Sequence, residues 1–185
     1  MNLTRLLFSL FLILALSAFS GCGYQFRADG EPVGIEIQSI AIPMVESNSS
    51  EKGFEADFTT VLRNEFISHS RVPVKNMDQA SMILRVQIYE VRTQPLTYNS
   101  RYIEDSGIVV TYEETSSRRL VLRLNASLID KSNGNVIWND GSMTEEARFT
   151  VTDDPLVNSK NQREALLKIA GLLSERIYNR TTERF

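Results

Sequence analysis

Cys22 is the single cysteine of this 185-residue chain, and its surroundings indicate one kind of thiol chemistry. A nearly apolar run of 14 residues, Leu6 to Phe19, precedes it, with Arg5 before the run and the small residues Ser20 and Gly21 after it. This run has the length of a signal-peptide core and is shorter than the roughly 20 apolar residues that span a bilayer. The sequence therefore predicts that residues 1–21 are a lipoprotein export signal and that Cys22 becomes the lipid-bearing first residue.

The predicted lipid anchor also bears on where the protein is held. A lone cysteine forms no internal disulfide, so lipidation at Cys22 explains its position after a signal peptide. Each buried acyl methylene contributes about 0.8 kcal/mol, and two or more chains hold a protein firmly on a membrane. Gly23, rather than an aspartate, follows the cysteine. Enterobacterial-type sorting then permits transfer, so we expect localisation to the outer membrane.

Residues that could carry catalysis do not form a recognisable set. His69 is the only histidine, and one histidine without a cysteine partner does not make a zinc site. No serine lies in a nucleophile elbow, and no glycine pattern suits a phosphate-binding loop. The acidic pairs Glu113–Glu114, Glu145–Glu146 and Asp153–Asp154 are typical of solvated strand ends, turns and helix caps. We expect a protein that is not an enzyme, without a catalytic residue, cofactor or metal.

Composition agrees with one small soluble domain behind the anchor. Acidic side chains (23) outnumber basic ones (20), and no basic run is present, which argues against a nucleic-acid partner. Residues 22–34 are polar and rich in turn formers, so they are predicted to be a short tether. Residues 35–185 are long enough to form a single domain with a real core.

Apolar periodicity predicts the elements of this domain. A first strand spans Ile35 to Ile42 and ends at Pro43. A helix covers about 53–68, with Phe54, Phe58, Val61, Leu62 and Phe66 at helical spacing, and a short strand is predicted at 72–74. A strand with alternating apolar residues begins at Met82, and the clearest strand places Leu120, Leu122, Leu124, Ala126 and Leu128 on one face. Asn133–Gly134 predicts a type I′ hairpin turn before a strand beginning at Val136. A helix of about 161–179 comes last, with Leu166, Ile169, Leu173 and Ile177 along one side.

This order predicts an α+β fold, a two-layer sandwich with a mainly antiparallel sheet of about four strands and two helices packed on one face. The helices cover the apolar face of the sheet. The other face carries polar residues that no predicted element covers: Arg85, Gln87, Arg123, Asn125 and Ser127. We expect that face to be wet or to be covered by a partner.

Several motifs resemble the lipopolysaccharide-assembly lipoprotein family (LptE-like). They are Cys22-Gly23-Tyr24-Gln25-Phe26, Ser39-Ile40-Ala41-Ile42-Pro43-Met44 with Asn48 soon after, Pro95-Leu96-Thr97-Tyr98, and Leu120 to Asp130 followed by Val136-Ile137-Trp138. The resemblance extends in order over nearly all of the chain after the signal. One departure is Ala80-Ser81, where many relatives have Ala-Asp before the strand.

The resemblance implies a specific role and specific partners. Such proteins are anchored on the periplasmic side of the outer membrane, lie within the lumen of a large β-barrel translocon, help it assemble, and contact lipopolysaccharide. The phosphates and acidic sugars of that lipid call for Arg or Lys donors. By position, Arg118, Arg119 and Lys160 resemble basic residues of relatives. The first two would enter the main strand, and Lys160 would lie in the loop before the last helix.

A different class of lipoprotein is an alternative interpretation. Regulatory lipoproteins that activate a cell-wall synthase also place a small α+β domain behind a lipid anchor. They usually have a long disordered tether, whereas about a dozen residues separate Cys22 from Ile35. A periplasmic enzyme is a third possibility, and the absence of a catalytic set disfavours it.

Overall fold

The structure of the protein is a computed structural model, and it describes residues 37–49, 53–105 and 108–182. Cys22 and the predicted signal and tether lie outside the described residues. The elements, in chain order, are β1 (Ile40–Ala41), β2 (Glu46–Ser47), α2 (Glu55–His69), β3 (Met82–Asp105), β4 (Ile108–Asp130), β5 (Val136–Thr150) and α3 (Pro155–Thr182). Neither helix in the described ranges is both long and apolar enough to span a bilayer.

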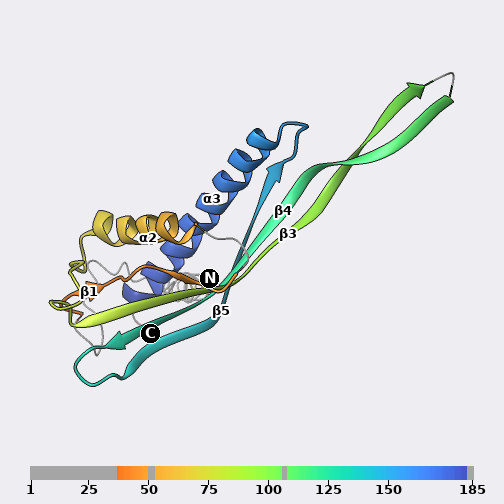
Figure 1. Ribbon diagram of the computed structural model, residues 1–185. Helices are drawn as coiled ribbons and strands as arrows, with labels where there is room; N and C mark the ends of the chain where they lie inside the picture. Colours follow the sequence, from red (N-terminus) through yellow and green to blue (C-terminus); the bar gives the residue numbers. More distant parts are fainter. Residues whose placement is uncertain (1–36, 50–52, 106–107, 183–185) are drawn as a thin grey trace, which may run out of the picture. The chain divides into compact units, whose positions relative to one another are not determined.

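The five strands form one mixed sheet, which confirms the predicted α+β class (Figure 1). The long strands β3, β4 and β5 are antiparallel, whereas the two-residue strands β1 and β2 both pair in parallel with β3. The first strand is much shorter than expected, because the backbone N–H of Ser39, just before it, donates to the Oγ atom of Ser81 (3.1 Å) instead of to a neighbouring strand. Its predicted start at Ile35 lies outside the described residues. The predicted short strand at 72–74 is a single bridge between Val74 and Ile40.

The core lies between the sheet and the two helices, which occupy the same side of the sheet in Figure 1. All five predicted core positions of β4 (Leu120, Leu122, Leu124, Ala126 and Leu128) are 0% exposed. They pack with apolar stripes of α2 and α3, which include Phe58, Leu62, Phe66, Ile169, Leu173 and Ile177. Full burial of one such large side chain contributes about 1.5–3 kcal/mol, so this layer is the main source of stability.

Both helices follow their predicted stripes, but α3 begins earlier than expected. The Oδ1 atom of Asp154 accepts hydrogen bonds from the backbone N–H groups of Leu156 (2.8 Å) and Val157 (3.4 Å). Pro155 occupies the first helical position, where its missing N–H costs nothing. The predicted capping role of Asp153–Asp154–Pro155 is thus confirmed. The predicted start at residue 161 was wrong because the first turn of α3 is solvated and shows no apolar stripe.

The connection between β4 and β5 corrects the predicted two-residue turn. Five residues, 131–135, lie between the strands, and only Gly134 among them has a positive φ, of 73°. The carboxylate of Asp130 accepts hydrogen bonds from the backbone N–H of Ser132 (2.8 Å) and from the Nδ2 atom of Asn133 (3.0 Å). A hydrogen bond from the Ser132 hydroxyl (2.7 Å) is the main cause that lowers the pKa of Asp130, and the bonds from the Ser132 backbone and from Asn133 act in the same direction. Side-chain acceptors therefore stabilise a wider loop than the Asn–Gly pair predicted.

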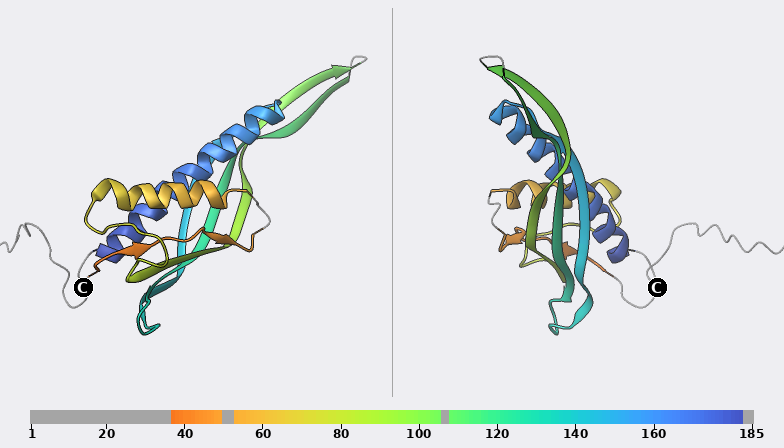
Figure 2. Two further views of the ribbon diagram at one scale, coloured as in Figure 1. Left: turned by 60° about the vertical axis from the view of Figure 1, so that its left-hand side comes forward. Right: turned by 90° about the vertical axis from the view of Figure 1, so that its right-hand side faces the viewer.

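The hairpin of β3 and β4 extends well past the end of β5, a feature that the sequence pattern did not predict (Figure 2). Register pairs continue from Tyr98↔Thr115 to Asp105↔Ile108, whereas β5 pairs with β4 only from Ser117 to Ile129. We call residues 98–105 and 108–115 the distal ribbon. The motif Pro95-Leu96-Thr97-Tyr98 lies inside β3 where its register shifts. The extension was missed because a ribbon that buries neither face has no period-two pattern.

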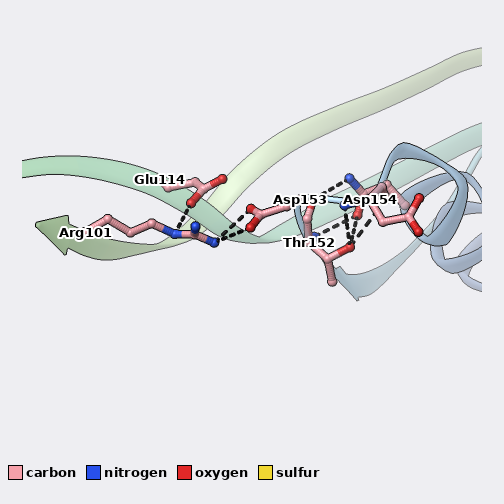
Figure 3. Close-up of polar contacts among 6 residues, drawn as sticks. Arg101, Glu114, Thr152, Asp153 and Asp154 are labelled. Carbon is pink, nitrogen blue, oxygen red and sulfur yellow. Dashed lines mark hydrogen bonds and ion pairs between the residues drawn. The ribbon is translucent and has the colours of Figure 1, made fainter. Parts of the chain in front are cut away.

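One ion-pair cluster ties the distal ribbon to the loop before α3 (Figure 3). The Nη2 atom of Arg101 lies 2.8 Å from both carboxylate oxygens of Asp153, and its Nε atom lies 2.6 Å from Oε2 of Glu114. The hydrogen bond from Arg101 and the positive charge of its guanidinium lower the pKa of Asp153. The same contacts raise the pKa of Arg101.

Candidate binding surface

The sheet face opposite the helices is polar in the structure, as the sequence predicted. We call it the outer face, and its side chains alternate with the buried ones along β3, β4 and β5. Cross-strand register places on it Arg85 with Ser127, Gln87 with Asn125, Glu90 with Arg123, and Arg119 with both Gln94 and Arg148; Arg92 and Glu146 face the same way. Within the three-stranded part of the sheet, the charged residues on this face are five arginines and two glutamates. No described helix or loop packs over them, so the face is a cationic surface open to a partner.

Ion pairs satisfy part of this cationic surface. Glu90 accepts from Arg92 and also from Nη1 of Arg123, which lies 3.1 Å from its Oε2. Nη1 of Arg119 lies 3.5 Å from Oε2 of Glu146. Within the described part of the chain, Arg85 and Arg148 have no acidic partner, and both are exposed. Surface ion pairs of this kind contribute little to the stability of a fold. Because Arg85 and Arg148 are exposed and have no such pair, their guanidiniums are the groups most available to an anionic partner.

A hollow of about 370 Å³ lies at the β1 and β2 end of the outer face. It is lined by residues of β3 (Arg85, Val86 and Gln87), of β4 (Asn125 and Ser127), of the segment around β2 (Pro43, Met44 and Glu46) and of the loop before β3 (Met77). The Oδ1 atom of Asn125 is buried without a hydrogen-bond partner. The hollow thus offers a guanidinium, amides and a hydroxyl beside methionine side chains.

The structure separates the three basic residues that the resemblance singled out. Arg118 and Arg119 were expected at the start of the main strand, but they lie in the middle of β4. As neighbours in a strand, they face opposite sides of the sheet. Arg118 pairs in register with the buried Phe149 on the helix side, whereas Arg119 belongs to the outer face. Lys160 lies inside α3 rather than in a loop, because the helix begins at Pro155. Its Nζ atom is 3.8 Å from Oε1 of Glu164.

Two of the three residues nevertheless occupy the same end of the domain. Asn161, next to Lys160, donates a hydrogen bond from Nδ2 to the backbone oxygen of Thr150 (2.9 Å). Thr150 pairs with Ser117, which precedes Arg118. Arg118 and Lys160 therefore lie on the helix side, where β5 ends and the distal ribbon begins. Arg119 cannot join them without crossing the sheet.

His69 and several of the paired acidic residues have structural partners. His69 stacks on Tyr178, with ring centroids 4.4 Å apart, and its Nε2 lies 3.0 Å from Oε1 of Glu65. Glu145 pairs with Arg176 of α3, and Glu114 and Asp153 share Arg101. Among residues 37–49, 53–105 and 108–182, no group of His, Cys, Asp and Glu could hold a metal ion.

Part of the outer face was not predicted from the sequence. Arg92, Glu90, Glu146 and Arg148 lie there because β3 and β5 continue beyond the residues whose pattern identified them, and because a bulge follows Ile88. The bulge shifts which side of the sheet each later residue faces. The sequence signal that could have found them is an alternation of apolar and polar residues that shifts by one position after Ile88.

One comparison with a solved structure supports the fold. No family model and no curated protein matches the sequence. A crystal structure of a Xanthomonas campestris protein is similar, with a TM-score of 0.51 at 11% identity over 85% of this chain and 91% of that one. A minor lipoprotein of Acinetobacter baumannii (TM-score 0.44, 18% identity, 79% and 95% covered) is also similar. So is a lipoprotein of Neisseria meningitidis (TM-score 0.39, 11% identity, 77% and 96% covered).

Proposed function

We propose that this protein is a lipoprotein of the outer membrane that plugs, and helps to assemble, the large β-barrel translocon that delivers lipopolysaccharide to the cell surface. The lipid on Cys22 anchors it on the periplasmic side of the membrane. The domain lies within the lumen of the barrel, and the outer face is its main contact with the lumen wall.

The observation that carries this proposal is the uncovered, arginine-bearing outer face. The helices bury the apolar side of the sheet, while the other side has five arginines, two glutamates and several amides and hydroxyls. The lumen of an outer-membrane barrel is polar, unlike its lipid-facing surface. A wall of this kind is complementary to a wet and charged sheet face. The order of LptE-like motifs and the signal sequence before Cys22 support the same conclusion.

Contact with lipopolysaccharide follows as the finer part of the proposal. Phosphates and acidic sugars bind best to Arg and Lys through charge-assisted hydrogen bonds. Arg118 and Lys160 lie at the same end of the helix side, and both are exposed. We assign them to one site, and we leave Arg119 to the outer face with Glu146.

Purification from membranes in mild detergent tests the partner. We expect the tagged protein to bring down one large, heat-modifiable barrel at a fixed ratio. Its deletion should leave that barrel misassembled and the cell surface poor in lipopolysaccharide. Arg85→Glu with Arg148→Glu should reduce recovery of the barrel, because it reverses two charges on the outer face. Neither residue has an ion pair in the described part of the chain, so the variant should keep its fold. The matched control, Lys75→Glu with Lys168→Glu, changes the charge equally away from the outer face and should keep the barrel.

The opposite result identifies the other class of lipoprotein. Recovery of a cell-wall synthase as the stable partner, with barrel assembly intact in the deletion, would discard the plug.

The lipid anchor has a test of its own. Cys22→Ala should abolish palmitate labelling and leave a soluble or uncleaved product, and undiminished labelling in that variant would reject the lipoprotein assignment.

A further inference from the structure

The distal ribbon exposes more large apolar side chains than a solvated hairpin needs. Six of them, each between 39% and 72% exposed, lie within 15 residues of the chain: Tyr98, Tyr102, Ile108, Val109, Val110 and Tyr112. They occupy both faces of the ribbon, since Tyr102 and Val109 alternate with Val110 and Tyr112. A two-stranded ribbon alone is marginally stable in water, so large apolar side chains exposed on both of its faces favour contact with a partner.

The backbone of β3 is also open along this ribbon. β1 and β2 pair with β3 only as far as Ile88, and no other described strand continues on that side. The edge is protected up to Thr97 by Pro95 and by the register shifts around it. From Tyr98 to Asp105 there is neither a proline nor a bulge. Alternate N–H and C=O groups of this stretch form a template on which a further strand can pair.

The opposite edge of the ribbon is less accessible at its base. Where β5 ends, the backbone N–H of Val151 still donates to the oxygen of Ser116 (2.9 Å). Two residues later, Asp153 is held by Arg101. The chain leaving the sheet therefore stays beside the start of the ribbon on the β4 side, whereas the β3 edge is open from the base of the ribbon, at Tyr98, to Asp105.

Charge selects among the possible occupants of this edge. The ribbon contains four carboxylates (Glu104, Asp105, Glu113 and Glu114) and one guanidinium, that of Arg101, which is paired with Glu114 and Asp153. A second copy would place one acidic ribbon against another. Lipid would leave the edge N–H and C=O groups and the carboxylates without partners in hydrocarbon. A basic polypeptide satisfies both the edge and the charge.

We propose that an extended segment of another protein, one that alternates apolar residues with Lys or Arg, pairs as an added strand along Tyr98–Asp105. Backbone hydrogen bonds to β3 would provide affinity, and the exposed Tyr and Val side chains with Glu104 and Glu113 would provide selectivity. This surface is separate from the outer face, so the inference does not depend on the proposed function.

A short synthetic peptide that alternates valine with lysine is the probe. We expect it to bind the full-length protein and to slow amide hydrogen exchange specifically in residues 98–105. Two matched peptides should not bind. One has glutamate for lysine, and the other keeps the side chains but has N-methyl groups on the amides of one edge. Equal binding of the lysine and glutamate peptides, or protection elsewhere in the domain, would overturn the proposal.

Protein variants complete the test. Glu104→Lys with Glu113→Lys should raise the Kd of the lysine peptide roughly tenfold by reversing the charge beside the edge. The control Glu164→Lys with Glu175→Lys reverses two exposed charges on α3 and should leave the Kd unchanged. Protection of residues 98–105 that appears without peptide, on raising the protein concentration or on adding phosphatidylcholine vesicles, would assign the edge to self-pairing or to lipid and reject a basic strand.

Discussion

Arg101 and Asp153 lie 52 positions apart in the chain, yet both oxygens of the Asp153 carboxylate are 2.8 Å from Nη2 of Arg101. The contact joins the distal ribbon to the residue before Asp154, which caps α3. Glu114, across the ribbon from Arg101, holds the Nε side of the same guanidinium. One planar cation thus fixes the base of the ribbon relative to the start of the last helix.

Removing this cation should loosen the ribbon without unfolding the domain. In Arg101→Ala, amide hydrogen exchange in 98–105 and 108–115 should become clearly faster, while the melting temperature stays close to that of the natural protein. Exposed ion pairs add little to global stability, and the core lies elsewhere. Lys160→Ala, which removes another exposed pair, is the control and should leave exchange in the ribbon unchanged. Equal exchange in Arg101→Ala and the natural protein would show that the contact does not restrain the ribbon.

The same contact should titrate only in acid. The hydrogen bond and charge of Arg101 lower the pKa of Asp153 below its ordinary value of 3.8. A carboxyl whose pKa is lowered by folding contributes stability that is complete above 3.8 and is lost as the pH falls through the lowered pKa. NMR titration of the Asp153 carboxyl should therefore give a midpoint below 3.8, and Arg101→Ala should raise it. An unchanged midpoint in the variant would contradict the pairing.

Leu124 and Ser127 test the assignment of the two faces of the sheet. Leu124 is 0% exposed in the layer between sheet and helices, whereas Ser127 lies on the outer face. Leu124→Ala should destabilise the domain by about 2–5 kcal/mol, and Ser127→Ala by far less. Thermal melts of the two variants compare them directly. Similar melting temperatures would mean that the faces are reversed.

The sequence predicts the parts of this fold in which one face is buried. The alternation around Leu124 and the helical spacing of Leu166, Ile169 and Leu173 both follow from contact with the core, so both predictions were confirmed. The distal ribbon and the first turn of α3 bury no face, and their residues therefore have no periodic pattern. The loop after Asp130 depends on side-chain hydrogen bonds that a dipeptide rule does not include.

The candidate surface was predictable to a similar degree. Alternation placed Arg85, Arg123 and Asn125 on an uncovered face, and the structure agrees. Arg118 and Arg119, which the resemblance grouped together, face opposite sides of the sheet because they are neighbours in one strand. Lys160 was expected in a loop because the stripe of α3 becomes visible only after it. Which residues lie together in space depends on where each helix and strand begins and ends. A sequence pattern predicts those boundaries least accurately.

Charge reversal at Arg118 and Lys160 tests the lipopolysaccharide site. The double variant Arg118→Glu, Lys160→Glu should bind immobilised lipopolysaccharide clearly more weakly than the natural protein, with an unchanged melting temperature, because both side chains are exposed. Arg119→Glu is the comparison. It faces the opposite side of the sheet, its Nε is buried, and it pairs with Glu146, so it should lower stability more than lipopolysaccharide binding. A larger loss of binding in Arg119→Glu would place the site on the outer face.

Photo-crosslinking from the outer face tests the central claim most directly. Arg123 is the better position, since its side chain is exposed whereas the carbonyl oxygen of Asn125 is buried. With a photoreactive residue at Arg123 in living cells, irradiation should join the protein to one large outer-membrane barrel, and samples kept dark should show no such product. Capture of a cell-wall synthase instead, or no barrel product on irradiation, would contradict the placement of this face against a barrel lumen.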